Sequence, residues 1–240
     1  METNPNGIAK IMIIGVGGGG GNAVNAMIKA GIKNVEFLAL NTDQQALTKL
    51  AANQMPIGEK VTRGLGAGAN PEVGREAALE SKDKIQEALQ GVDLLFIAAG
   101  MGGGTGTGAA PIVAQIAKEL GILTIAVVTK PFNFEGIRRM KNAELGIENL
   151  KGNVDSLVIV QNEKLNRDKN FSIMDAFTKA DEILLQGIRG ITDIVVQDGR
   201  INLDLADIKS VMRNSGMAHM GIGEGRGKNK TIDAIRKAVY

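Results

Sequence analysis

Two glycine runs, each lying between an apolar run and an amphipathic stretch, constrain this chain most. They span Gly15–Asn22 and Gly100–Gly108. Glycine has no Cβ, so successive glycines let main-chain N–H groups approach an anion, and a following helix adds the partial positive charge of its N-terminus. In the second run, the hydroxyls of Thr105 and Thr107 would add further donors. A tight turn alone needs one or two glycines, so both runs predict phosphate-binding sites.

Strand-length apolar runs alternate with longer amphipathic stretches over the first 160 residues. Strands are expected at Ile8–Ile14, Val35–Leu40, Val92–Ala98, Ile122–Thr129 and Ser156–Val160, and helices at Gly21–Ala30, Pro71–Gln90, Thr107–Leu120 and Glu135–Leu150. Continuous β-branched runs are typical of strands covered on both faces, and strand–helix alternation predicts an α/β fold with a parallel sheet. The loops after the strands then meet at one edge of the sheet, where ligands of such folds bind.

The pattern changes near residue 173. Ile173–Gln197 has apolar residues at spacings of three or four and predicts one long helix, which packing must hold because Gly187 and Gly190 weaken it. A short strand is expected at Met217–Ile222 and a last helix at Thr231–Val239. We therefore expect a nucleotide-binding α/β domain at 1–172, a connecting core helix at 173–197 and a separate α+β unit at 198–240.

Composition excludes several classes of function. The net charge is +2 and aromatic residues make up 3%, which predicts neither a nucleic-acid partner nor an anionic membrane. There is no cysteine and a single histidine, His219, so disulfides, thiolate metal sites and a Ser-His triad are not expected. No apolar run is long enough to insert into a membrane.

Two alternatives follow from the glycine runs themselves. Gly15, Gly17 and Gly20 match the G-x-G-x-x-G pattern, which would suit an NAD-binding Rossmann oxidoreductase. The NAD alternative leaves the second run unexplained. Two phosphate-binding runs at one edge of the sheet suit a nucleoside triphosphate. A third small-residue loop, Gly64–Glu72, would close over its terminal phosphate. No Gly-Lys-Ser/Thr follows either run, as a Walker P-loop would require. A nucleotide-binding module without turnover is the other alternative.

The segment Gly102–Gly108, GGGTGTG, resembles the signature of the tubulin/FtsZ GTPases. Five further segments, in order over nearly the whole chain, resemble the bacterial cell-division branch of that family: Gly17–Asn25, Asn41–Leu47, Gly66–Gly74, Pro131–Gly136 and Asn202–Met212. The resemblance implies a cytoplasmic GTPase of the division site and septum, which uses GTP or GDP with Mg²⁺. It names no metal ligand from the chain. Gln161-Asn162-Glu163 stands where the family usually has Pro-Asn-Asp.

The resemblance also implies roles for individual residues. Gly68 and Ala69 would lie near the terminal phosphate, Glu135 and Arg139 near the ribose and neighbouring groups. Asn162 and Asp181 would read the guanine, and Phe177 would stack against it. The remaining nucleotide-binding residues would be Gly17, Gly18, Gly19, Gly20, Gly21, Asn22, Asn41, Gly102, Gly103, Gly104, Thr105 and Gly106.

Hydrolysis needs a group that orients water at the terminal phosphate. Near the glycine runs the sequence offers only Asp43. In the resembled family, the loop that carries Asp204 and Asp207 enters the nucleotide site of the next subunit, so these carboxylates would be catalytic there. An ordinary helix-capping role is the alternative. Such a head-to-tail contact produces filaments because it does not close on itself.

The family normally continues past residue 240 with a further sheet and a tail that docks membrane-anchoring proteins. We therefore expect 198–240 to be the remnant of a truncated second domain. Nucleotide binding should then persist, while hydrolysis, filament formation and tail-dependent partners would be impaired.

Overall fold

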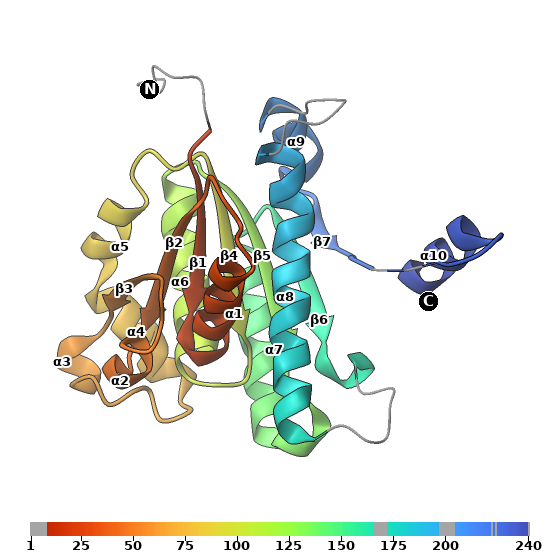
Figure 1. Ribbon diagram of the computed structural model, residues 1–240. Coiled ribbons are helices and arrows are strands. Elements are labelled where there is room, and N and C mark those ends of the chain that lie inside the picture. The colour runs from red at the N-terminus through yellow and green to blue at the C-terminus, as the bar shows by residue number, and fades with distance from the viewer. Residues whose placement is uncertain (1–8, 166–171, 197–204, 222, 224, 240) are drawn as a thin grey trace.

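The computed structural model describes residues 9–165, 172–196, 205–221, 223 and 225–239, and its strands form one parallel sheet (Figure 1). The strands are β1 (Ile11–Val16), β2 (Glu36–Asn41), β3 (Asn53–Pro56), β4 (Leu94–Gly100), β5 (Leu123–Lys130), β6 (Ser156–Gln161) and β7 (Gly216–Ala218). They lie in the order β3-β2-β1-β4-β5-β6-β7, and every pairing is parallel. The predicted α/β fold with a parallel sheet is confirmed.

The glycine runs follow two neighbouring strands. β1 lies between β2 and β4, so the chain leaves it first toward one side of the sheet and later toward the other. Such a switch point opens a crevice at the carboxyl ends of the strands, where α/β proteins bind their ligands. Because one run follows β1 and the other follows β4, both lie at this crevice, at the lower edge of the sheet in Figure 1.

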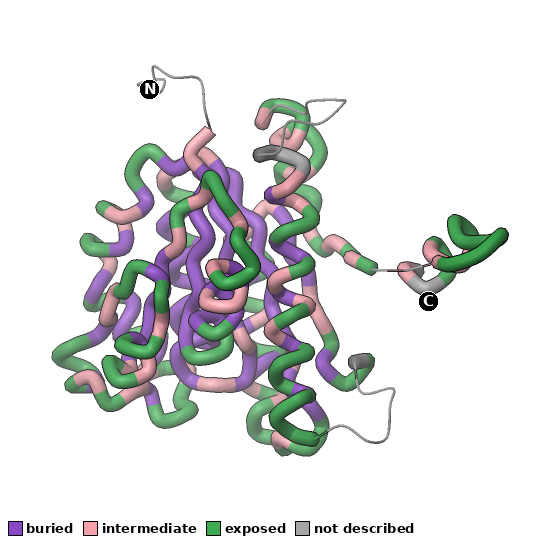
Figure 2. The backbone as a smooth tube through the Cα atoms, viewed as in Figure 1, coloured by how far each residue is buried: buried purple, intermediate pink, exposed green. Residues whose placement is uncertain are grey.

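Helices cover both faces of the sheet (Figure 2). They are α1 (Gly17–Lys29), α2 (Gln44–Leu47), α3 (Glu59–Thr62), α4 (Pro71–Glu80), α5 (Lys82–Ala88), α6 (Thr105–Glu119), α7 (Ile137–Lys151), α8 (Ile173–Val196), α9 (Leu205–Met212) and α10 (Lys230–Val239), with 3-10 turns η1 (Asn133–Glu135) and η2 (Asn162–Leu165). The buried side chains of α1 and α8 pack on one face, and those of α4, α5, α6 and α7 pack on the other. Burial from both faces explains why the strands read as continuous apolar runs.

Several boundaries differ from the prediction. α1 begins at Gly17 and α6 at Thr105, so most of the first glycine run is helix, and Pro111 lies beyond the first turn of α6. The helix expected over 71–90 breaks at Ser81, whose hydroxyl accepts the N–H of Gly58 at 3.0 Å. Periodicity did not predict β3, α2 or α3, because each has only four residues.

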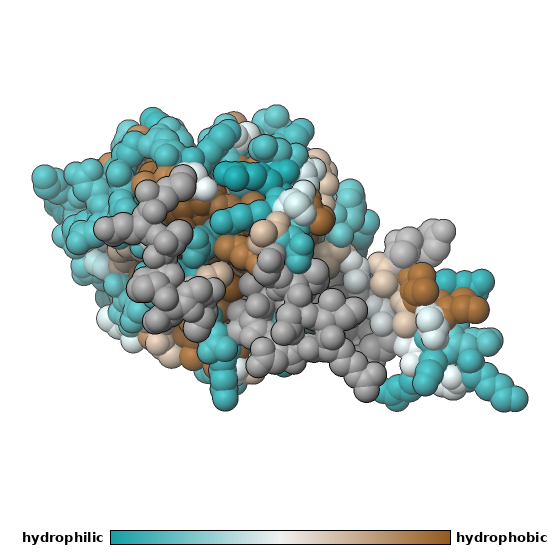
Figure 3. Space-filling view, turned by 90° about the horizontal axis from the view of Figure 1, so that it is seen from above, coloured by the Kyte–Doolittle hydropathy of each residue, from teal (hydrophilic) through white to brown (hydrophobic). Residues whose placement is uncertain are grey.

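β7 extends the sheet beyond β6. Asp155, just before β6, anchors it: its carboxylate accepts the N–H groups of Thr124 and Asn214, at 2.9 and 3.2 Å. Beyond β7, α10 projects from the body, and Figure 3 shows apolar side chains open to solvent on this projecting unit. Ile232 and Ile235 are among them. None of the helices within the described residues has the length and apolar character needed to span a membrane.

The two glycines of α8 differ in their surroundings, which gives a stability prediction. A Cβ on Gly190 would meet open space, so Gly190→Ala should raise the free energy of unfolding by about 1 kcal/mol through helix propensity. A Cβ on Gly187 would lie 2.8 Å from Cε of Met220, so Gly187→Ala should gain less. Urea unfolding of both variants measures the difference. Equal effects, or a loss of stability at residue 190, would contradict this account of α8.

Candidate nucleotide-binding site

α1 and α6 begin without the side-chain caps that usually satisfy a helix N-terminus. The N-cap residues, Val16 and Gly104, make no side-chain capping bond, and neither first turn holds an acidic residue. In contrast, the side chains of Asp43 and Asn70 cap α2 and α4, although α3, α5 and α7 also lack a side-chain cap. The first N–H groups of an uncapped helix need an outside acceptor, and its dipole favours an anion. The two helix starts described here follow the neighbouring strands β1 and β4.

The glycines of these runs fall into two groups. A Cβ on Gly20 would overlap the carbonyl oxygen of Ala98, and one on Gly106 would lie 2.6 Å from that of Gly100. These glycines are required by close main-chain packing, of Gly20 on β4 and of Gly106 within the second run. Gly17, Gly19, Gly21, Gly102 and Gly104 likewise face atoms of the chain.

Three of the predicted glycines instead face open space. A Cβ on Gly18, Gly103 or Gly68 would have no atom within 4 Å. Gly18 is exposed on α1, one helical turn from the exposed Asn22. Gly68 has a φ of 56°, which favours glycine by itself. Neither packing nor a positive φ explains Gly18 and Gly103, so these two mark the surface that a ligand can approach.

The hydroxyls expected to contact phosphate are engaged within the protein. Thr105 Oγ1 lies 2.7 Å from Oγ1 of Thr42, and Thr107 Oγ1 accepts the N–H of Gly102 at 2.8 Å. Both threonines are buried, and buried hydroxyls require partners. These hydrogen bonds fix the second glycine run, while Thr107, whose oxygen accepts, keeps its own O–H as a donor beside the main-chain amides.

The end of β2 is organised in a similar way. Asn41 is buried, and its side-chain oxygen accepts the N–H of Asp43 at 3.3 Å. Oδ1 of Asp43 accepts the N–H of Ala46 as the cap of α2. The carboxylate that the sequence offers for orienting water thus has a structural role.

The loop 64–70 follows α3 and reaches toward the second glycine run. Gly68 and Ala69 have φ of 56° and 58°, in the left-handed region. For alanine this conformation costs about 1 kcal/mol, so contacts must hold it. A Cβ on Gly104 would lie 2.7 Å from Cβ of Ala67, so this loop packs directly on the start of α6.

A second group of predicted residues lies at the end of β6 and on α8. Asn162 is buried, and its side-chain oxygen has no hydrogen-bond partner. Burial raises the pKa of the Asp181 carboxyl from 3.8 to about 6, and no described residue pairs with it. An orphaned buried amide oxygen and a desolvated carboxylate are acceptors that suit the N–H groups of a ligand.

Three phenylalanines gather beside these acceptors. Phe177 lies 5.8 Å from Phe132 and 6.2 Å from Phe134 between ring centroids, edge to face in both pairs, and Phe132 and Phe134 stack at 5.0 Å. Phe177 is 39% exposed, so it is not only a core residue of α8. Sequence reasoning did not single out Phe132 and Phe134, although their place in the segment 131–136 was a usable signal.

Glu135 and Arg139 form an ion pair at 2.5 Å, four residues apart. The other oxygen of Glu135 accepts the N–H of Phe132 at 2.9 Å. Glu135 therefore fixes the turn that carries Phe132 and Phe134, while the half-exposed Arg139 remains accessible.

Asp207 lies far from all these residues. α8 begins at the edge of the sheet that carries the glycine runs and ends near the opposite edge, where α9 lies (Figure 1). Its 24 residues span about 36 Å. Asn214, two residues beyond α9, is bonded to Asp155 at the amino end of β6. Asp204 falls outside the described residues.

Two uncapped helix starts at a switch point, with acceptors and aromatic rings on the same edge, define a nucleotide-binding α/β protein. Residues 10–170 match the model of the tubulin/FtsZ family, GTPase domain, and the chain belongs to that family. It therefore carries a tubulin-like GTPase domain, and the NAD-binding alternative is not favoured.

Solved structures agree over almost the whole chain. An empty FtsZ dimer from M. jannaschii is 46% identical, with a TM-score of 0.94 over 98% of this chain and 69% of that chain. CetZ1 from Haloferax volcanii, a GDP-bound monomer, is 26% identical, with a TM-score of 0.77 over 90% of this chain and 68% of that chain. CetZ2 from the same organism, a GTPγS-bound protofilament, shares the fold at 24% identity, with a TM-score of 0.80 over 95% and 70%. The expected bacterial branch is not confirmed, since the matching FtsZ structures are archaeal.

Proposed function

We propose that this chain binds and hydrolyses GTP and assembles head to tail into filaments of a cytoplasmic cell-division apparatus. The observation that carries the proposal is the pair of uncapped helix starts, α1 and α6, which open on one edge of the sheet. One anion-binding helix start suits a mononucleotide phosphate or a pyrophosphate. Two neighbouring helix starts suit a triphosphate, because Gly18 and Gly103 have no side chain that would keep the ligand from the main chain.

The phosphates would lie against Gly17–Asn22 and Gly102–Gly106, with Gly68 and Ala69 at the terminal phosphate. Mg²⁺ would enter with the nucleotide, held by phosphate oxygens and water, which are ligands it prefers.

Guanine would bind at the other end of the site. The carboxylate of Asp181 can accept both guanine N–H donors, the edge of adenine presents the wrong pattern, and the amide of Asn162 supplies a further polar contact. Phe177 would stack on the base, while Arg139, fixed by Glu135, and Asn41 would contact the ribose side. The orphaned oxygen of Asn162 and the unpaired carboxyl of Asp181 support this assignment.

Hydrolysis would require a second copy of the chain. Asp207, with Asp204, would complete the site of the next subunit, because Asp207 lies at the opposite edge of the sheet from its own glycine runs. A contact between two different edges does not close on itself and therefore yields filaments. The M. jannaschii FtsZ structure, which is 46% identical and a dimer, supports self-assembly. Membrane-anchoring proteins would be further partners. We propose the same domain boundaries as in the sequence analysis, with a nucleotide-binding domain at 1–172, a connecting helix at 173–197 and a second unit at 198–240.

Competition binding and phosphate release test the proposal. GTP should displace a fluorescent guanine nucleotide, while ATP and NAD should not. Phosphate release per molecule should rise steeply with protein concentration, because each complete site needs two subunits. GTP binding without any concentration-dependent release would favour the module without turnover, and preferential binding of NAD would reject the proposal.

The affinity for GTP should depend on pH through Asp181. The apo carboxyl has a pKa of about 6, and guanine N–H donors favour its ionised form. Protons therefore compete with GTP, and affinity should fall by up to about tenfold per pH unit below pH 6 and level off above it. Asp181→Asn should remove this component and keep the titration of the phosphates, which serves as the control. Identical pH profiles for both proteins would contradict the role of Asp181.

The same pKa fixes a dependence of stability on pH. Because the folded-state pKa is raised above 3.8, ionisation of Asp181 destabilises the apo fold. Its contribution to stability should be most favourable below pH 4, fall as the pH rises from 4 to about 6, and stay constant above. Asp181→Asn should flatten this part of the pH profile of urea unfolding.

A further inference from the structure

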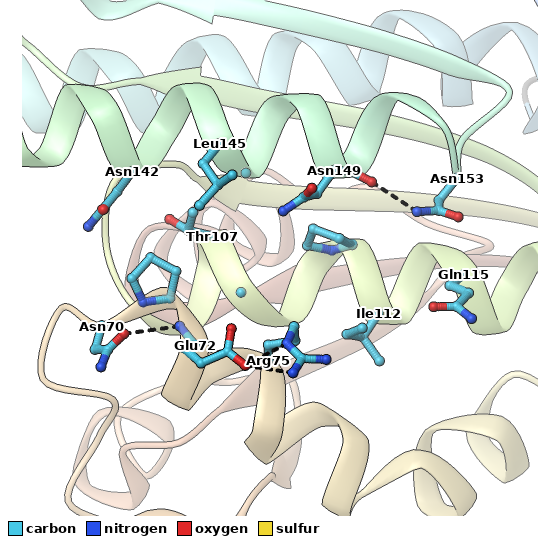
Figure 4. A pocket seen from close by; sticks show the side chains of 14 residues that line it. Asn70, Glu72, Arg75, Thr107, Ile112, Gln115, Asn142, Leu145, Asn149 and Asn153 are labelled. Carbon is cyan, nitrogen blue, oxygen red and sulfur yellow. Dashed lines mark hydrogen bonds and ion pairs between the residues drawn. The ribbon is translucent and has the colours of Figure 1, made fainter.

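Asn142 on α7 touches two loops of the proposed site. Its side-chain nitrogen donates to the carbonyl oxygens of Ala69 and Gly102, each at 3.4 Å. Figure 4 shows this side chain extending from α7 on the side of the groove that Asn70 also lines. Because both neighbours are carbonyl oxygens, only a donor fits this position. A carboxylate would be repelled by both.

Each of the two contacted residues has a main-chain conformation that needs support. Ala69 lies in the left-handed region at φ 58°, and Gly102 has φ 107°. α7 also packs on the second loop, since a Cβ on Gly102 would lie 2.8 Å from the carbonyl oxygen of Arg139. The first turns of α7 are thus a rigid surface against which both loops are placed.

We propose that Asn142 is a positioning residue that holds loop 64–70 against the second glycine run, so that both loops reach the terminal phosphate together. The proposal rests on the proposed function, which puts Gly68 and Ala69 at that phosphate. A nucleoside triphosphate uses both loops for its third phosphate, whereas a diphosphate lacks that phosphate and does not need loop 64–70. Asn142 therefore contributes to the preference for GTP over GDP.

The test measures the dissociation constants of GDP and GTPγS for the whole chain and four variants. Asn142→Asp should weaken GTPγS binding about tenfold and GDP binding less than about twofold, as expected for lost hydrogen bonds with added repulsion. Asn142→Ala should show a smaller loss in the same direction. Asn149→Asp is the matched control, because Asn149 lies on the same helix, lines the same groove of about 500 Å³ and bonds to neither loop. It should change neither constant.

Two outcomes would overturn the inference: unchanged constants in both Asn142→Asp and Asn142→Ala, or equal losses for GDP and GTPγS, which would indicate a merely structural role. Asn142→Gln keeps the amide donors and should retain the preference for GTPγS, so it carries the test where the aspartate variant does not fold. If the unaltered chain binds GDP and GTPγS equally well, the inference fails while the proposed function stands. If it binds neither, the proposed function fails first.

Discussion

Asp207→Asn is expected to bind GTP with unchanged affinity and to release phosphate about 100-fold more slowly, the usual loss when a group that assists proton transfer is removed. The reason is geometric: Asp207 sits on α9, near the end of α8 that is opposite to the glycine runs, and α8 spans about 36 Å. If Asp207 is catalytic as proposed, it therefore acts on the nucleotide of another copy. Phosphate release and competition binding on the same preparation measure the two quantities separately.

Mixing sharpens this experiment. When unaltered chain is mixed with the variant at constant total protein, each variant molecule spoils the nucleotide site of its neighbour. Turnover should therefore fall in proportion to the fraction of variant in the mixture. Asp233→Asn is a matched control, because Asp233 also lies in the first turn of a helix, on α10, and should leave turnover unchanged. A loss of GTP binding in the Asp207 variant would place the carboxylate in its own subunit's pocket and contradict head-to-tail completion.

The second prediction with a large effect concerns Gly18 and Gly20, which lie in one helical turn: alanine at Gly18 should impair GTP binding, and alanine at Gly20 should impair stability. Gly18→Ala should keep the fold, because the new methyl group meets open space and alanine favours the helix by up to about 1 kcal/mol. It should weaken GTP binding about 100-fold, since the methyl group displaces the phosphate from the amides, at a cost of roughly 3 kcal/mol.

Gly20→Ala should do the opposite. Its methyl group would overlap the carbonyl oxygen of Ala98, and two main-chain segments cannot move apart cheaply, so we expect a loss of about 3 kcal/mol or more of stability. Urea unfolding without nucleotide and binding of a fluorescent guanine nucleotide distinguish the variants. Full GTP affinity in Gly18→Ala would remove the first glycine run from the nucleotide site.

The parallel sheet and the position of the two glycine runs were predictable because they depend on local patterns. Runs such as Leu94–Gly100 are buried on both faces and carry no polar alternation. A glycine run after such a strand has few structural explanations. The long helix α8 was also predictable from its spacing, and its buried residues include Ala180, Leu184 and Ile188.

The division of labour within the site was not predictable, since it depends on contacts between distant segments. Nothing local separates Gly18 from Gly20, which differ only because Ala98 lies beside one of them. The hydrogen bond of Thr105 was not predictable for the same reason, because its partner Thr42 lies 63 residues away. Asn142 was not singled out, because its partners lie 40 and 73 residues away.

The uncapped starts of α1 and α6 offer mostly main-chain amides, and this has a consequence for engineering the protein. Amide groups cannot be exchanged by mutation, so side-chain changes in the two glycine runs can block triphosphate binding, as expected for Gly18→Ala, but offer little means of strengthening it. Altered base preference is open to redesign, because it would depend on replaceable side chains such as Asp181 and Asn162. A library aimed at new nucleotide analogues should therefore vary α8 and the end of β6 and leave both runs untouched.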